Sequence, residues 1–294
     1  MPIVTANNLQ IEYESFGNET APAILLIMGL GAQLSRWNVE LCQALVERGY
    51  RVLRFDNRDC GLSSKLDEAG VPDIGRALRR GVAPDAPYSL EDMAADCIGL
   101  LDALGIEAAH MVGASMGGAI AQIVAARYPE RCLSLTSIMS TSSHPDLPRP
   151  SSEAAQALLA PLPAARDRES LIEDAIRRQL AVASPDYPSC PDRLRSQFVE
   201  EHERGFHPRG VTRQLAAFLA SGDRRALLAT IKAPTLVLHG ADDPLIPLAC
   251  GEDVAAHIPA AELRVIEGMA HDFPLALTEV FADAIAAVAS RSQR

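Results

Sequence analysis

The chain has 294 residues, of which 48% are hydrophobic, and its 27 Lys and Arg against 38 Asp and Glu give a formal charge of −11. This composition excludes the disordered, collagen-like and low-complexity classes, which need low hydrophobicity or strong compositional bias. A chain of this length can bury a large core and still carry a pocket and an inserted subdomain. The acidic balance, with basic residues dispersed among acidic ones, argues against a nucleic-acid partner.

The six cysteines lie far apart and form no C-x-x-C pair, so the sequence predicts free, buried thiols and no zinc cluster or redox motif. The N-terminal stretch MPIVTANNLQIEYESFG lacks the basic region and the apolar run of a secretory signal. No apolar run approaches the roughly 20 residues that cross a bilayer. We therefore expect a soluble, cytoplasmic protein with no membrane span.

Short apolar runs dominate the first 140 residues. Residues 3–6 and 10–16, joined through Asn7 and Asn8, resemble an antiparallel hairpin. Four later runs show no polar alternation, which is typical of strands buried on both faces: residues 23–28, 51–55, 110–113 and 133–139.

Helical patterns separate these runs. The clearest spans residues 90–104, where Ser89 and Asp92 form a variant of a capping box and Gly105 follows the last turn. Strands that alternate with helices in this way predict an α/β fold with a mostly parallel central sheet flanked by helices.

The pattern changes between residues 144 and 229, where nine of the 20 prolines fall and no strand pattern appears. Helical spacing continues in residues 171–180 and 211–219, and prolines between these stretches would break the helices apart. The segment 144–229 therefore reads as a small helical insertion.

After the insertion, strand patterns return at residues 235–239 and 262–266, and a last helix is expected over residues 275–289. We therefore predict one core domain made of residues 1–143 and 230–294.

The clearest chemical motif is G-x-S-x-G at residues 113–117, placed between a strand pattern and a helical pattern at 119–128. A serine on such a tight turn needs small neighbours and exposes its hydroxyl above the edge of the sheet. Ser115 is therefore the expected nucleophile. Because a serine hydroxyl is a weak nucleophile, it needs a nearby base, and the helix that starts at Met116 offers backbone N–H groups to an oxyanion.

In folds of this type the nucleophile comes first along the chain, then the acid, and then the histidine that acts as the base. Three histidines follow Ser115 beyond the insertion. His239 ends a predicted strand and His257 lies within a helical pattern, so both are more simply structural. His271 lies in the loop 267–274 just after a strand, where its imidazole could take the serine proton. His271 is the expected base.

A carboxylate is needed to orient the histidine and to accept its Nδ1 proton. Asp242 and Asp243 both lie just past the end of a strand, and Asp272 is a third option. Asp243 is the preferred candidate, but periodicity alone does not separate two adjacent acids.

Three segments together resemble the α/β-hydrolase superfamily: the motif at 113–117, the stretch 240–247 and the stretch 268–271. The resemblance covers essentially the whole chain. In that family the acid lies three residues after a glycine and four before a proline, so the resemblance selects Asp243 over Asp242.

The resemblance also implies an oxyanion hole, formed by the backbone N–H groups of Leu30 and Met116. The family places a histidine–glycine pair after the third strand, and here Met28 replaces that histidine. The backbone role is unaffected by this departure, whereas polar support from residue 28 is lost. The insertion at 144–229 is expected to cover the site as a cap (lid) and to line the pocket.

Two further stretches, residues 28–33 with Trp37 and residues 55–63, are similar to the branch that contains aclacinomycin methylesterase-like carboxylesterases. Trp37 is expected in the core or in the pocket wall. Three charged residues after the second predicted parallel strand indicate a structural network of ion pairs and turns: Asp56, Arg58 and Asp59.

The sequence contains no dinucleotide fingerprint, no P-loop and no metal-binding histidine run, so we expect no cofactor and no metal. The predicted function is a serine carboxylesterase that cleaves a small-molecule ester through an acyl-enzyme. A serine lactonase, a C–C bond hydrolase and a ligand-binding receptor on the same fold are the alternatives, and the protein is expected to be a monomer or a homodimer.

Overall fold

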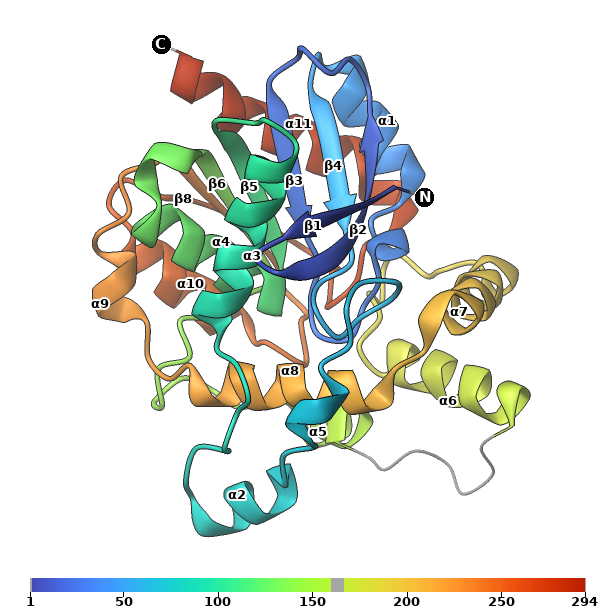
Figure 1. Ribbon diagram of the computed structural model, residues 1–294. Coiled ribbons are helices and arrows are strands. Elements are labelled where there is room, and N and C mark those ends of the chain that lie inside the picture. The colour runs from blue at the N-terminus through green and yellow to red at the C-terminus, as the bar shows by residue number, and fades with distance from the viewer. Residues whose placement is uncertain (1, 160–166, 294) are drawn as a thin grey trace.

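The computed structural model describes residues 2–159 and 167–293, and one sheet of eight strands forms its centre (Figure 1). The strands are β1 (Ile3–Ala6), β2 (Leu9–Phe16), β3 (Ala23–Ile27), β4 (Arg51–Phe55), β5 (Ala109–Ala114), β6 (Cys132–Ile138), β7 (Thr235–Gly240) and β8 (Glu262–Ile266). Their order is β1-β2-β4-β3-β5-β6-β7-β8. The first two pairings are antiparallel, and all neighbours from β4 to β8 run parallel.

The predicted fold class is confirmed, since the sheet is mostly parallel and helices flank it. Each predicted strand appears within one residue of its expected ends. At the opening hairpin, Asn7 and Asn8 have φ angles of 49° and 62°. Asparagine tolerates this left-handed region, which the tight turn between two twisted strands requires.

Helices lie between and after the strands of the sheet. They are α1 (Val39–Glu47), α2 (Ile74–Arg80), α3 (Leu90–Ala103), α4 (Met116–Arg127), α5 (Ser152–Leu159), α6 (Arg168–Leu180), α7 (Pro191–Gly205), α8 (Pro208–Ala220), α9 (Arg225–Leu228), α10 (Leu248–His257) and α11 (Thr278–Ala289). α1 and α11 pack on one face of the sheet, and α3, α4 and α10 pack on the other.

The side chains of each central strand are divided between these two layers. In β3, Ile24 and Leu26 belong to the core beneath α1 and α11, whereas Leu25 and Ile27 belong to the core beneath α3 and α4. All four are fully buried. This explains the continuous apolar runs in the sequence, because a strand covered on both faces has no solvent side that would favour polar residues.

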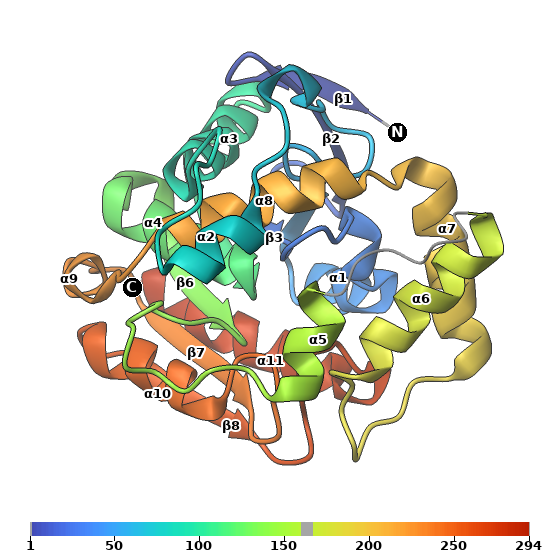
Figure 2. The same ribbon diagram turned by 90° about the horizontal axis from the view of Figure 1, so that it is seen from below.

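Between β6 and β7, the described residues form helices and no strand. α5, α6, α7 and α8 lie across the carboxyl-terminal edge of the sheet, as Figure 2 shows from below. Pro191 and Pro208 occupy the first positions of α7 and α8, where a missing N–H costs nothing. Prolines therefore start two helices of this segment as well as separating its helical stretches. Pro161 and Pro163, also part of the predicted insertion, lie outside the described residues.

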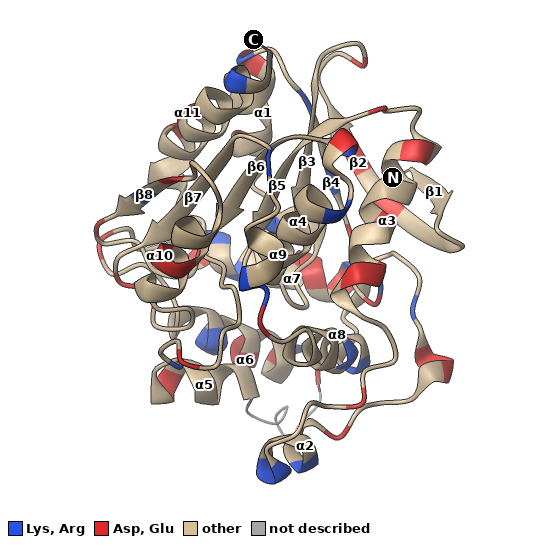
Figure 3. Ribbon diagram, turned by 90° about the vertical axis from the view of Figure 1, so that its left-hand side faces the viewer, with Lys and Arg blue, Asp and Glu red and all other residues tan. Residues whose placement is uncertain are grey.

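The sequence patterns did not indicate α2, which lies on the side of α8 away from the sheet (Figure 3). It carries three arginines: Arg76, Arg79 and Arg80. The helix α3, in contrast, has the predicted capping box between Ser89 and Asp92.

All six cysteines are unpaired, and Cys190 is exposed while the other five are buried. In the described part of the chain, no helix combines the length and the apolar character that crossing a bilayer would require.

Candidate active site

Ser115 lies at the turn between β5 and α4 in a strained backbone conformation, with φ 56° and ψ −121°. A Cβ atom at Gly113 would lie 2.1 Å from the carbonyl oxygen of Gly117, and one at Gly117 would lie 2.1 Å from the carbonyl oxygen of Ile27, so this turn needs glycine on both sides of the serine. The backbone of the turn is held from β6, because Ser115 N–H donates to the carbonyl of Ile138 at 2.9 Å. A strained and well-supported turn of this kind is typical of a nucleophile elbow.

His271 and Asp243 form a hydrogen-bonded pair, with 2.7 Å between His271 Nδ1 and Asp243 Oδ2. The second carboxylate oxygen of Asp243 accepts the backbone N–H groups of Leu245 and Ile246 at 2.9 and 2.8 Å. Burial works to raise the pKa of Asp243, but the charge of His271 and these hydrogen bonds outweigh it and hold the pKa below its usual value. Asp243 is therefore ionised when it faces the imidazole.

The other candidate acids and histidines have different partners. Asp242 is exposed and accepts the backbone N–H of Gly268 at 3.0 Å, and Asp272 binds the hydroxyl of Ser184. His257 contacts the carbonyl of its own helix, at Asp253.

His239 is fully buried, and its Nε2 lies 2.7 Å from the carbonyl of Ile246. Burial lowers the pKa of His239, so the ring is neutral and donates to that carbonyl. His239 therefore supports the loop whose N–H groups hold Asp243.

The candidate oxyanion donors lie on either side of Ser115. Leu30 follows β3 in the loop that begins at Met28, and Met116 is the first residue of α4, whose N–H has no partner within the helix. A Cβ atom at Gly29 would lie 3.0 Å from Ser115 Cβ, so the β3 loop approaches the serine closely.

A cavity of about 1010 Å³ joins these groups, since Leu30, Ser115, Met116 and His271 all line it. Helices α2 and α5 to α8 supply the opposite wall. That wall is largely apolar and includes Leu171, Ile172, Phe198, Leu215 and Phe218. Ser115 Oγ makes no hydrogen bond to His271 in this structure, although both residues are among those described.

Two of the charged groups on the cavity wall, Arg36 and Glu201, are paired with each other. The guanidinium of Arg36 binds the carboxylate of Glu201 and the side-chain amide oxygen of Gln179, and lies 4.3 Å from the ring centroid of Phe198. This pairing and the apolar side chains of the wall leave much of the cavity surface uncharged. Within residues 2–159 and 167–293, no three His, Cys, Asp or Glu side chains gather as they would around a metal ion.

Trp37 belongs to the core and is not part of the cavity wall. It is fully buried and packs on Phe273, with 4.6 Å between ring centroids. The sequence had left open whether Trp37 lies in the core or in the pocket wall.

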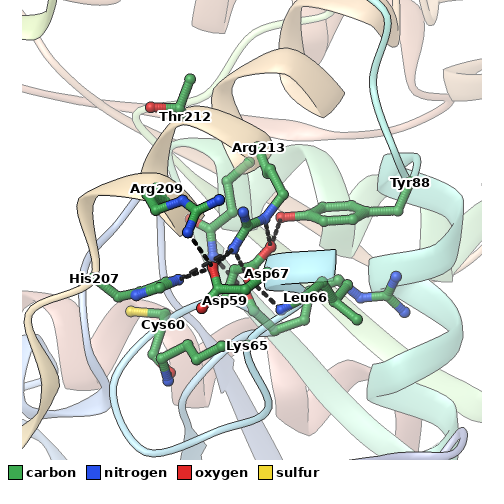
Figure 4. A network of polar contacts seen from close by, with 12 residues as sticks. Asp59, Cys60, Lys65, Leu66, Asp67, Tyr88, His207, Arg209, Thr212 and Arg213 are labelled. Carbon is green, nitrogen blue, oxygen red and sulfur yellow. Dashed lines mark hydrogen bonds and ion pairs between the residues drawn. The ribbon is translucent and has the colours of Figure 1, made fainter. Parts of the chain in front are cut away.

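The charged residues after β4 form the structural network that the sequence predicted. Arg58 binds Asp96 at 2.6 Å, and Asp56 accepts the N–H of Leu34 at 2.7 Å. Asp59 binds Arg213 of α8, as Figure 4 shows. These groups hold together segments that are far apart in the sequence.

No role was assigned from the sequence to two residues near the oxyanion loop, Asn57 and Gln214. Asn57 Nδ2 donates to the carbonyl of Met28 at 2.9 Å, and Gln214 Oε1 accepts the N–H of Gly31 at 2.8 Å. An isolated amide side chain has no pattern that links it to a distant loop. These two amides, and not residue 28, supply the polar support of the loop.

Known proteins resemble this chain over most of its length. A family model described as the α/β hydrolase fold matches residues 22–275. Rhodomycin D methylesterase of Streptomyces peucetius is 27% identical, and the alignment covers 97% of this chain and 96% of the methylesterase. The 3-oxoadipate enol-lactonase 2 of Acinetobacter baylyi is 27% identical, with 98% of this chain and 96% of the lactonase covered.

Among solved structures, a meta-cleavage product hydrolase from Pseudomonas fluorescens aligns with a TM-score of 0.79 and 21% identity over 99% of this chain and 98% of that chain. This likeness concerns the fold. The methylesterase match confirms the resemblance to the methylesterase branch that the sequence motifs indicated. With the family match across most of its length, the chain belongs to the α/β-hydrolase fold family.

Proposed function

We propose that this protein is a serine hydrolase that cleaves carboxylic esters through an acyl-enzyme. The observation that carries the proposal is the common cavity, in which the strained Ser115 and the Asp243-bound His271 both lie. The similarity to a methylesterase supports an ester as the substrate.

In the proposed reaction, Ser115 Oγ attacks the ester carbonyl while His271 takes the hydroxyl proton. The negative charge that develops on the carbonyl oxygen is stabilised by the N–H groups of Leu30 and Met116. His271 then gives its proton to the departing alcohol. A water molecule, activated in turn by His271, attacks the acyl-enzyme and releases the acid.

Asp243 keeps the imidazole in the tautomer that has its free nitrogen toward the serine, and it stabilises the imidazolium that forms. The hydrogen bond between Ser115 and His271 is expected to form when an ester is bound, because such contacts are often loose in the free enzyme. The reaction needs no cofactor and no metal.

We further propose that residues 144–229 act as a cap over a core of residues 1–143 and 230–294. Helices of this segment supply much of the cavity wall opposite Ser115. A cavity of about 1010 Å³ with a largely apolar wall suits a bulky, uncharged ester.

A serine lactonase and a C–C bond hydrolase would use the same groups. Both reactions remain alternatives. One relative is named as an enol-lactonase, and one protein of similar fold is named as a meta-cleavage product hydrolase. A ligand-binding receptor is disfavoured, since every position that the acyl-enzyme reaction needs is occupied.

The test is hydrolysis of p-nitrophenyl esters from acetyl to decanoyl by the wild type and by Ser115→Ala. We expect turnover by the wild type and a fall in kcat of at least about 10⁴-fold in the variant. The proposal is wrong if the wild type hydrolyses no ester, or if Ser115→Ala hydrolyses them equally well. Lactones and vinylogous diketones, assayed next, would then separate the remaining alternatives.

A further inference from the structure

The loop that carries the Leu30 N–H contains two glycines, Gly29 and Gly31, and the second has a φ of 65°. Glycine allows such a loop many conformations, so the loop sequence by itself does not fix the direction of the Leu30 N–H. An oxyanion donor is effective only when it is oriented before the charge develops. Groups outside the loop must therefore hold it.

Side chains hold the peptide groups on both sides of the one that carries this N–H. The Met28–Gly29 peptide is held through its carbonyl by Asn57 Nδ2 at 2.9 Å. The Leu30–Gly31 peptide is held through its N–H by Gln214 Oε1 at 2.8 Å. Because the Gly29–Leu30 peptide lies between two fixed planes, its N–H has little freedom to rotate.

Gln214 is the more distant of these two residues, 183 positions along the chain from Gly31 and located on α8. It is fully buried. Its Nε2 also donates to the carbonyl of Arg58 at 2.7 Å, so one amide joins the loop after β3 to the loop after β4. Both halves of the amide are used, which fixes its orientation.

The helix α8 is itself seated tightly against the same two loops. A Cβ atom at Gly31 would lie 2.8 Å from Val211 Cγ2, and one at Gly210 would lie 2.1 Å from the carbonyl of Asp59. The glycines at these positions allow the helix and the loops to touch.

Arg213, next to Gln214, fastens the helix further (Figure 4). Its Nε and Nη2 donate to the two carboxylate oxygens of Asp59 at 2.8 and 2.6 Å, with both side chains fully buried. Tyr88 also donates to Asp59, at 2.8 Å, and Asp67 lies 3.1 Å from Arg213 Nη2. The register of α8 is thereby fixed, and with it the position of the Gln214 amide.

We propose that Gln214 is a positioning residue for catalysis: from the helical segment, its amide orients the Leu30 N–H toward the oxyanion formed at Ser115. The inference rests on the proposed ester hydrolysis. It makes α8 more than a wall of the cavity, because displacement of this helix would release the oxyanion loop.

The first test compares Gln214→Met with Gln122→Met. Methionine has a similar volume and no amide, so it removes the hydrogen bonds without leaving a large cavity. Gln122 is an equally buried glutamine on a helix, with its amide on Ser137 Oγ at 3.1 Å. It therefore controls for the loss of a buried amide.

With p-nitrophenyl esters, we expect Gln214→Met to lower kcat by about 10- to 100-fold and to change KM little. This is somewhat less than the fall in kcat that follows removal of an oxyanion-hole donor itself. A boronic acid that mimics the tetrahedral intermediate should bind more weakly by a similar factor. Gln122→Met should lower the Tm without changing kcat. Equal kcat values for the two variants would overturn the inference.

Gln214→Glu decides the question if Gln214→Met does not fold. A protonated carboxyl at this position has the same shape, with an O–H for the Arg58 carbonyl and an acceptor for Gly31, and burial favours the protonated form. When the carboxyl ionises, it loses the proton that it donates to the Arg58 carbonyl, and the charge repels that carbonyl, so the side chain no longer holds the Gly31 N–H in a fixed direction. The ratio of variant to wild-type kcat should therefore be close to one in acid and fall as the pH rises. A ratio that does not depend on pH would contradict the proposal.

The two proposals fail in different ways. If wild-type turnover is absent or does not depend on Ser115, the proposed function is wrong and the inference falls with it. If turnover depends on Ser115 and the Gln214 variants behave as the Gln122 control does, only the inference is wrong.

Discussion

Two adjacent aspartates with opposite environments illustrate how this fold assigns roles at the scale of single residues. Asp243 is buried and bonded to His271, whereas Asp242 is exposed and accepts one backbone N–H. The same side chain at neighbouring positions therefore serves either as an ionised partner of the imidazole or as a turn residue.

This difference predicts opposite results for two matched variants. Asp243→Asn should lower kcat by about 10³- to 10⁴-fold, because an amide favours the wrong tautomer of His271 while it preserves the shape of the site. Asp242→Asn should remain close to the wild type. Steady-state kinetics on one p-nitrophenyl ester checks both, and similar losses in the two variants would contradict the assignment of Asp243.

At the scale of elements, buried ion pairs join the sheet to the helices between β6 and β7. Arg204 of α7 binds Glu12 of β2 at 2.7 Å and Asp56 at 3.2 Å. Burial raises the pKa of Glu12 to about 7, with a contribution from the hydrogen bond to Asp56, while Arg204 acts in the opposite direction. One carboxyl of this cluster therefore titrates near neutral pH.

A carboxyl whose pKa is higher in the folded chain than in the unfolded chain stabilises the fold. This stabilisation is complete at a pH below the pKa of the unfolded chain, and it is lost as the pH rises through the pKa of the folded chain. For Glu12 the two values are 4.5 and about 7. We therefore expect the Tm of the wild type to fall relative to that of Glu12→Gln, by about 2 to 4 °C, between pH 5 and pH 8.

Glu14→Gln is the control for the replacement of Glu by Gln on the same strand, since the Glu14 side chain is partly exposed and pairs with Arg54 instead of with the Arg204 cluster. Thermal unfolding followed by circular dichroism measures all three proteins. A Tm difference between wild type and Glu12→Gln that is constant with pH would show that Glu12 does not titrate in this range.

At the scale of the whole molecule, the large cavity arises because helices from the second half of the chain lie across the carboxyl ends of strands from both halves (Figure 2). The strand ends supply the reactive groups, and the helices supply apolar surface. The width of the cavity should therefore be adjustable from helices that do not contact the oxyanion loop, such as α6, without altering the reactive groups.

Leu171 and Leu180 of α6 test this separation, because Leu171 lines the cavity whereas Leu180 does not and is 56% exposed. Leu171→Trp should lower kcat/KM for the decanoyl ester by about tenfold or more and leave the acetyl ester nearly unaffected. Leu180→Trp should leave both unchanged. An equal loss for short and long esters in Leu171→Trp would indicate that the acyl chain lies elsewhere.

The sequence by itself determined the strands, the serine turn and the candidates for its partners. Apolar runs indicated strands that are buried on both faces of a sheet. The glycines beside Ser115 indicated a tight turn, and at these positions there is no room for a Cβ atom. These signals are local, because each depends on neighbouring residues whose spacing follows the period of one element.

Only the tertiary structure separated Asp243 from Asp242 by their contacts, placed Trp37 in the core and brought Gln214 to Gly31. Each of these outcomes depends on which distant segment lies opposite a side chain. Amides, carboxylates and a single tryptophan have no periodic pattern that encodes such a partner. Their roles were decided only when distant segments met: the loops after β7 and β8 for the two aspartates, the loop after β8 for Trp37, and α8 for Gln214.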